Sequence, residues 1–167
     1  SFFHSRRAQF RLCFFLLFVL FNFCLKAQDY IKIDSLNNYL TSAQEDSNKV
    51  KTLYELSIAY LYDDKERSIF YANQTLEIAK KINYKKGIGL GYTTIANISN
   101  VYGDYDKGVE YYLKAIKTFE YLKQDKYVAY NSSYLADIHQ ILGNYQQALK
   151  YDSLAYNKFK ALGMKQK

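Results

Sequence analysis

The sequence predicts an all-α fold, a solenoid of helical hairpins that follows a short N-terminal segment of a different kind. The chain after residue 48 matches itself at an offset of forty residues without any gap. Apolar residues in each copy recur at intervals of three and four, which is the spacing of one helix face. The 167 residues include no Pro and are 49% hydrophobic, which favours long helices and a core. Helical repeats of this kind stack on their neighbours into a quasi-linear array.

The first 27 residues have the organisation of a secretory signal peptide. Basic residues end at Arg11, an apolar run covers 12–25 with Asn22 as its one interruption, and a short "KAQ" follows. Eight of the 11 Phe lie before position 28 and all 19 Tyr lie after it, which marks a boundary. We therefore expect residues 1–27 to be cleaved after Ala27 and the protein to be exported. The alternative is an uncleaved leader that anchors the protein in a membrane.

Charge and cysteine usage narrow the class of partners. Four of the 23 basic residues lie in the leader, which has no Asp or Glu; the other 19 stand against 16 acidic residues, a net charge of +3. This balance is too weak to predict a nucleic-acid surface, and it argues against a helical-repeat RNA binder. Both cysteines, Cys13 and Cys24, lie in the leader. The cleaved protein would therefore have no disulfide and no cysteine-based metal site.

Residues 28–48 are predicted to cap the N-terminal end of the array. Ile33, Leu36, Tyr39 and Leu40 fall at helical spacing, which indicates a short helix that covers the first repeat. The array itself is expected at 49–167, in repeats of about 49–88, 89–128 and 129–167.

Each repeat is predicted to contain two helices joined by a tight turn. Gly103 and Gly143 suit the left-handed residue that ends a helix, and Asp104 and Asn144 suit the start of the next. Small residues on the two helices allow a close approach, and Tyr side chains fill the space beside them. The residues expected to pack the repeats are Ala96, Gly103, Tyr105, Ala115, Ala136, Gly143, Tyr145, Ala148 and Ala155.

These residues resemble the signature of the tetratricopeptide repeat, a helix–turn–helix unit. That signature has a small residue in the first helix, Gly-x-Tyr at the turn, and two Ala in the second helix. The third copy matches all five positions, the second replaces one Ala by Gly108, and the first is degenerate. The period of forty exceeds the usual ~34, and the usual closing Pro is missing, so longer helices are expected.

The resemblance implies that the first helix of each repeat lines a concave face that binds a peptide or another protein. The positions there that face away from the core carry hydroxyls and amides with one acid, groups that can hydrogen-bond an extended peptide. They include no Lys or Arg, so a clamp for a C-terminal carboxylate is not expected. The alternative is a plain solvated face without function. The candidate partner-binding residues are Ser57, Tyr60, Thr93, Asn97, Asn100, Ser133, Asp137 and Gln140.

Long-period, Tyr-rich repeats behind a signal peptide also resemble the exported N-terminal regions of bacterial envelope signalling proteins. In those proteins the array precedes a membrane helix and a histidine kinase or DNA-binding module. The resemblance implies a location in the periplasm or cell envelope, or at the inner membrane if the leader stays uncleaved. The chain stops where a fourth repeat is expected, so any output module or further membrane segment would lie beyond Lys167. We therefore expect a non-catalytic interaction scaffold or, alternatively, the sensory fragment of such a signalling protein.

Three motifs that suggest chemistry have simpler structural interpretations. "GIGLGY" at 87–92 lacks the preceding strand and the Gly-Lys-Ser/Thr ending of a phosphate loop, so its glycines indicate close helix packing. His139 has no candidate nucleophile beside it and is interpreted as a lone surface residue. Asp63, Asp64 and Glu66 lack the spacing of a calcium loop and fit the start of a helix. We therefore predict no catalytic residue, no metal site and no cofactor.

The leader prediction is tested by sequencing the N-terminus of the protein purified from cells that export it. We expect the mature chain to begin at Gln28, because the apolar run enters the translocon and the peptidase cuts after Ala27. A mature protein that begins at Ser1 would contradict cleavage and favour the membrane anchor.

Overall fold

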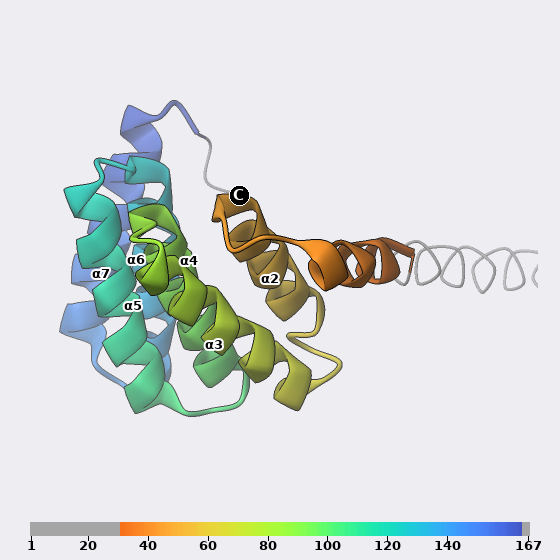
Figure 1. The fold of residues 1–167 in the computed structure, drawn as a ribbon. Helices are drawn as coiled ribbons and strands as arrows, with labels where there is room; N and C mark the ends of the chain where they lie inside the picture. The colour runs from red at the N-terminus through yellow and green to blue at the C-terminus, as the bar shows by residue number, and fades with distance from the viewer. Residues whose placement is uncertain (1–30, 165–167) are drawn as a thin grey trace, which may run out of the picture. The chain divides into compact units, whose positions relative to one another are not determined.

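The computed structural model describes residues 31–164, and every regular element in that range is an α-helix (Figure 1). The predicted all-α repeat fold is confirmed, because successive helices pack on one another in an array within the unit Ala43–Lys167. The helices of this unit are α2 (Ser47–Ala59), α3 (Lys65–Lys81), α4 (Lys85–Val101), α5 (Tyr105–Tyr121), α6 (Asp125–Ile141) and α7 (Tyr145–Ala161).

The predicted capping helix is present as a helical segment over residues 31–42. It belongs to a compact unit of its own, Ser1–Ser42, separate from the array. The signal peptide expected at 1–27 lies outside the described residues, so its cleavage stays a prediction. Among the residues that are described, no helix combines the length and apolar character needed to cross a bilayer.

The period of forty residues consists of two equal units of twenty. Helices α3 to α7 are each 17 residues long, and a three-residue connection separates each from the next. Each of these helices is therefore about 25 Å long. A residue with positive φ, between 54° and 79°, lies two positions after each of them. These left-handed residues are Asn83, Gly103, Lys123, Gly143 and Gly163.

The predicted helix ends at Gly103 and Gly143 are confirmed. The amide of Gly103 donates to the carbonyl of Asn100 at 3.2 Å, and the amide of Asp104 donates to the carbonyl of Ser99 at 2.8 Å. These two bonds satisfy the last carbonyls of α4, as in a Schellman motif. Nothing lies within 4 Å of a Cβ built on either glycine, so backbone conformation alone selects glycine there.

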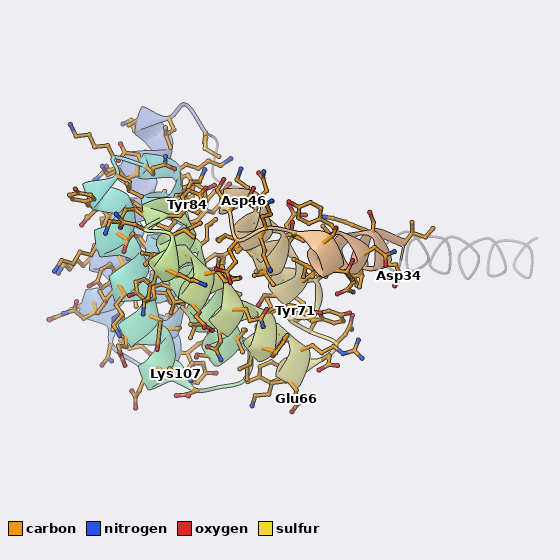
Figure 2. All side chains as sticks on the ribbon, in the orientation of Figure 1. Asp34, Asp46, Glu66, Tyr71, Tyr84 and Lys107 are labelled. Atoms are coloured by element: carbon orange, nitrogen blue, oxygen red, sulfur yellow. The ribbon has the colours of Figure 1, made fainter. Side chains whose placement is uncertain are left out.

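Helix starts are of two kinds in this array. Asp46 precedes α2, and its carboxylate accepts from the amides of Asn48 and Lys49 (Figure 2). Asp104 and Asn144 stand at the predicted starts of α5 and α7, but their side chains make no capping bond. Their backbone amides already serve the preceding helix through the turn described above.

Small side chains hold the helices close together, as predicted. The five alanines expected to pack the repeats are all buried, and Tyr105 packs against the main core cluster. The expectation for Tyr145 is wrong, because its side chain is 71% exposed. Helix α6 packs against α5, whereas no helix follows α7 in the part of the chain that the structure describes.

Three buried glycines explain the "GIGLGY" motif as a packing device of α4. A Cβ on Gly89 would lie 2.7 Å from the ring of Phe119, and one on Gly91 would lie 3.2 Å from Cα of Leu76. A Cβ on Gly87 would lie 2.7 Å from Val50 of α2. The interpretation as close helix packing is therefore confirmed, with α2, α3 and α5 each approaching α4.

We expect Gly89→Ala to lower the free energy of unfolding by about 1 kcal/mol. Overpacking against Phe119 costs about 1–3 kcal/mol, which exceeds the gain of about 1 kcal/mol in helix propensity. Denaturant unfolding would measure the loss, and Phe119→Leu supplies the control background, because it removes the ring that Cβ would meet. In that background the same change should cost less or stabilise. Equal losses in both backgrounds would contradict the steric explanation.

Candidate functional site

The side of the array formed by α2, α4 and α6 carries the predicted partner-binding residues. Helices α2 and α4 pack against each other directly. The hydroxyl of Thr93 on α4 lies 2.9 Å from Oδ1 of the buried Asn131 on α6. These alternate helices therefore lie side by side, although each belongs to a different hairpin.

The first hairpin does not present its two predicted residues in the expected way. The prediction that Ser57 lies on the surface is wrong, because it is fully buried. Its hydroxyl donates to the carbonyl of Ser68 at 2.7 Å, and the hydroxyl of Ser68 donates back to the carbonyl of Ser57 at 2.8 Å. This reciprocal pair joins α2 to α3, so Ser57 serves packing.

Tyr60 is half-buried at the end of α2 and is engaged within its own hairpin. Its ring stacks on that of Tyr71, with centroids 5.8 Å apart. The guanidinium of Arg67 lies over the Tyr60 ring and donates to its hydroxyl at 3.2 Å. These contacts fix the ring against α3, which leaves little of it for a partner.

The polar residues of α4 meet a buried tyrosine of α5. The hydroxyl of Tyr112 donates to Oδ1 of Asn97 at 2.6 Å, and Asn100 also bonds to this hydroxyl. The Tyr112 side chain is fully buried, and its burial raises its pKa far above the ordinary value, so the phenol stays protonated. Because Asn97 uses its oxygen here, its amide N–H groups remain directed outward as donors.

Helix α6 supplies the residues of this side that are open to a partner. Ser133 is half-buried, while Asp137 and Gln140 are exposed, and none of the three side chains has a hydrogen-bond partner among the described residues. Partial burial raises the pKa of Asp137, and the nearby charge of Asp152 on α7 raises it further. The surface is therefore weakly acidic at this end.

Two exposed aromatic residues of this side were missed by the sequence reasoning. Tyr134 is 41% exposed and stacks on Tyr112 with ring centroids 5.9 Å apart. Tyr62 is 77% exposed and lies near enough to Tyr112 to contribute to its raised pKa. The aligned positions hold Tyr, Thr and Tyr at 54, 94 and 134, so a departure from the repeat was the available signal. We call Asn97, Asn100, Tyr112, Tyr134 and Asp137 the Tyr112 cluster.

His139 differs from its interpretation as a lone surface residue. Its ring stacks on that of Tyr151 in α7, with centroids 5.6 Å apart and planes within 8°. Burial lowers its pKa, and Nδ1 is buried without a partner in the described part of the chain. Contact with the adjacent helix, which spacing within α6 does not predict, explains the difference.

The acidic turn at 63–66 is confirmed as the start of a helix. Asp64 is the N-terminal cap of α3, and its carboxylate accepts from the amide of Arg67 at 2.9 Å. Glu66 follows in the first turn, where a negative charge opposes the helix dipole (Figure 2). Across residues 31–164 no group of His, Cys, Asp or Glu has the arrangement of a metal site.

Comparison with known proteins identifies no relative. No protein-family model matches the sequence, and no curated protein matches it significantly. The tetratricopeptide resemblance therefore rests on the residues of the chain, while the all-α repeat architecture rests on the structure.

The raised pKa of Asp137 predicts a pH-dependent cost to stability. The folded state holds this proton more tightly than the unfolded chain, so stability falls as pH rises above the ordinary value of 3.8. We expect Asp137→Asn to raise the free energy of unfolding at pH ~7, by up to about 0.5 kcal/mol, and to change it little at pH ~3.

Urea unfolding at the two pH values measures this difference. The same substitution in an Asp152→Asn background is the control, and there the gain should shrink, because one source of the raised pKa is gone. A stability change that is the same at both pH values would count against the electrostatic explanation.

Proposed function

We propose that this protein is a non-catalytic interaction scaffold, exported to the cell envelope, that binds a peptide or protein over the α4/α6 side of the array. The Tyr112 cluster supports the proposal best. It places an exposed aromatic ring next to amide donors and a carboxylate that have no partner among the described residues. The proposal holds equally for a separate scaffold and for the sensory region of a larger signalling protein.

The chemistry of the cluster favours an extended segment with a basic residue. The Asn97 and Gln140 side chains offer N–H donors that suit backbone carbonyls of a peptide. Tyr134 adds a rigid aromatic surface, which gives contact area at a low cost in side-chain entropy. The acidic pair of Asp137 and Asp152 attracts a cation at one end of the segment.

The same groups argue for binding in place of catalysis. The Tyr112 phenol stays neutral because of its burial, so it is no base at physiological pH. Asp137 is the acid of the cluster, and no hydroxyl or thiol nucleophile is bonded to it among the described residues. Recognition needs only the hydrogen-bonding and stacking groups that are present.

Selection of a displayed library of random linear peptides on the full chain tests the proposal. We expect enrichment of peptides with a basic residue, and we expect Gln140→Ala and Asp137→Ala to weaken the selected peptides by about fivefold or more each. The matched control is Gln147→Ala, which removes the same exposed amide from α7. Unchanged affinity in both cluster variants, or an equal loss in the control, would contradict the proposal.

A further inference from the structure

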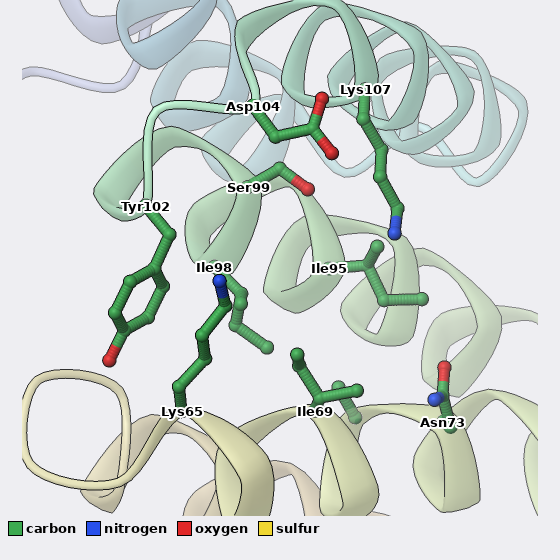
Figure 3. A pocket seen from close by; sticks show the side chains of 10 residues that line it. Lys65, Ile69, Asn73, Ile95, Ile98, Ser99, Tyr102, Asp104 and Lys107 are labelled. Carbon is green, nitrogen blue, oxygen red and sulfur yellow. The ribbon is translucent and has the colours of Figure 1, made fainter.

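A pocket of about 270 Å³ lies between α3, α4 and the start of α5 (Figure 3). Its apolar lining comes from Ile69 on α3 and from Ile95 and Ile98 on α4. Ile95 and Ile98 are buried, while Ile69 is 38% exposed at the pocket edge. None of these residues belongs to the Tyr112 cluster, so the pocket is a separate feature.

The pocket arises where this junction departs from the repeat. Ala72 and Ser99 line it, and forty residues later the chain has Tyr112 and His139 at the same positions. Asn73 at its edge corresponds to Leu113 in the same way. The next junction thus carries larger side chains at all three places. The space between α3 and α4 is therefore a property of the sequence here and not of the array.

Charged groups surround the apolar lining on two sides. Figure 3 shows Asp104 and Lys107 extending from the start of α5, with Lys65 on the α3 side of the pocket. Neither lysine has an ion pair among the described residues, and the Asp104 carboxylate makes no capping bond. Two cations and one anion are therefore available to a ligand.

Tyr102 holds one of the cations in place before any ligand binds. Its hydroxyl donates to the carbonyl of Leu61 at 3.1 Å, which fixes the ring against the first hairpin. The ammonium of Lys65 lies 4.6 Å from the centre of that ring. This cation–π contact reduces the freedom of a long side chain, so less entropy is lost when it meets an anion.

We propose that this pocket binds a free aliphatic α-amino acid. The ligand side chain rests on the isoleucine lining, its carboxylate lies between Lys65 and Lys107, and its ammonium group meets Asp104. A simple carboxylic acid would place an anion beside Asp104 without compensation, and a simple amine would leave both lysines unpaired. The volume lies just below the usual range for drug-sized ligands of about 300–1,000 Å³, which favours a ligand as small as leucine.

NMR titration of the full, isotope-labelled chain with L-leucine tests the proposal. Exposed ion pairs are weak, so we expect a dissociation constant on the order of 1 mM. Amide shifts should centre on Asn73, Ser99 and Lys107. N-acetyl-L-leucine lacks the ammonium and L-leucinamide lacks the carboxylate, and each should bind at least about fivefold more weakly. Absence of pocket shifts at about 20 mM L-leucine, or equal binding of all three compounds, would overturn the proposal.

Two variants copied from the next repeat locate the site. Lys107→Gln installs the residue found at 147, and Ser99→His installs the one found at 139. The first should weaken L-leucine at least about fivefold, and the second should abolish binding by filling the pocket. Lys117→Gln is the matched control, because it removes an exposed charge from the same helix. Lys107 is also exposed, so its variant tests the site even if Ser99→His misfolds. Equal loss in the control, or none in Lys107→Gln, would overturn the assignment.

Discussion

Gly89 lies against the ring of Phe119, and Gly91 lies against the backbone of Leu76. These two contacts bring α5 and α3 onto α4 from different directions, closer than any residue with a Cβ would permit. Helix α4 is consequently buried around most of its circumference, from Gly87 to Ser99. Both sites depend on this packing, because the polar groups of α4 reach the surface only where α2, α3, α5 and α6 leave it open.

The two sites also share an origin in departures from the repeat. In the first hairpin Ser57 and Ser68 bond reciprocally across the helix interface. In the second hairpin the same positions hold Asn97 and Gly108, and a Cβ on Gly108 would meet Ile138 at 2.8 Å. The glycine lets the next repeat approach, while the asparagine accepts from Tyr112. Repeated residues thus build the array, and substitutions within the pattern create surfaces and spaces.

The sequence was sufficient for the features that depend on local chemistry. The helical periodicity, the repeats and the left-handed ends at Gly103 and Gly143 were all predictable, because each follows from neighbours in the chain. Asn83 and Lys123 adopt the same left-handed conformation, which residue type alone did not indicate. Their places in the twenty-residue period decide it, and that period emerges only when all five helices are compared.

The candidate site was less predictable, because exposure depends on which helix lies opposite. Ser57 and Asn97 occupy equivalent positions, yet only the asparagine sits beside an exposed face. Tyr112 was not singled out, since the depth of a tyrosine in an array depends on packing between repeats. The same limit applies to the pocket, whose lysines come from the starts of two helices that lie forty residues apart.

Ser99 and Asn100 are consecutive residues of α4, yet one lines the pocket and the other bonds to Tyr112 in the cluster. An α-helix turns by about 100° per residue, so adjacent side chains diverge to different sides. A ligand on one side would influence the other only by moving α4 as a body. The glycine contacts with Phe119 and Leu76 oppose such a movement, because close-packed interiors have no free volume to absorb it. Rigid packing of α4 therefore keeps the two surfaces energetically separate, and each is governed by its own side chains.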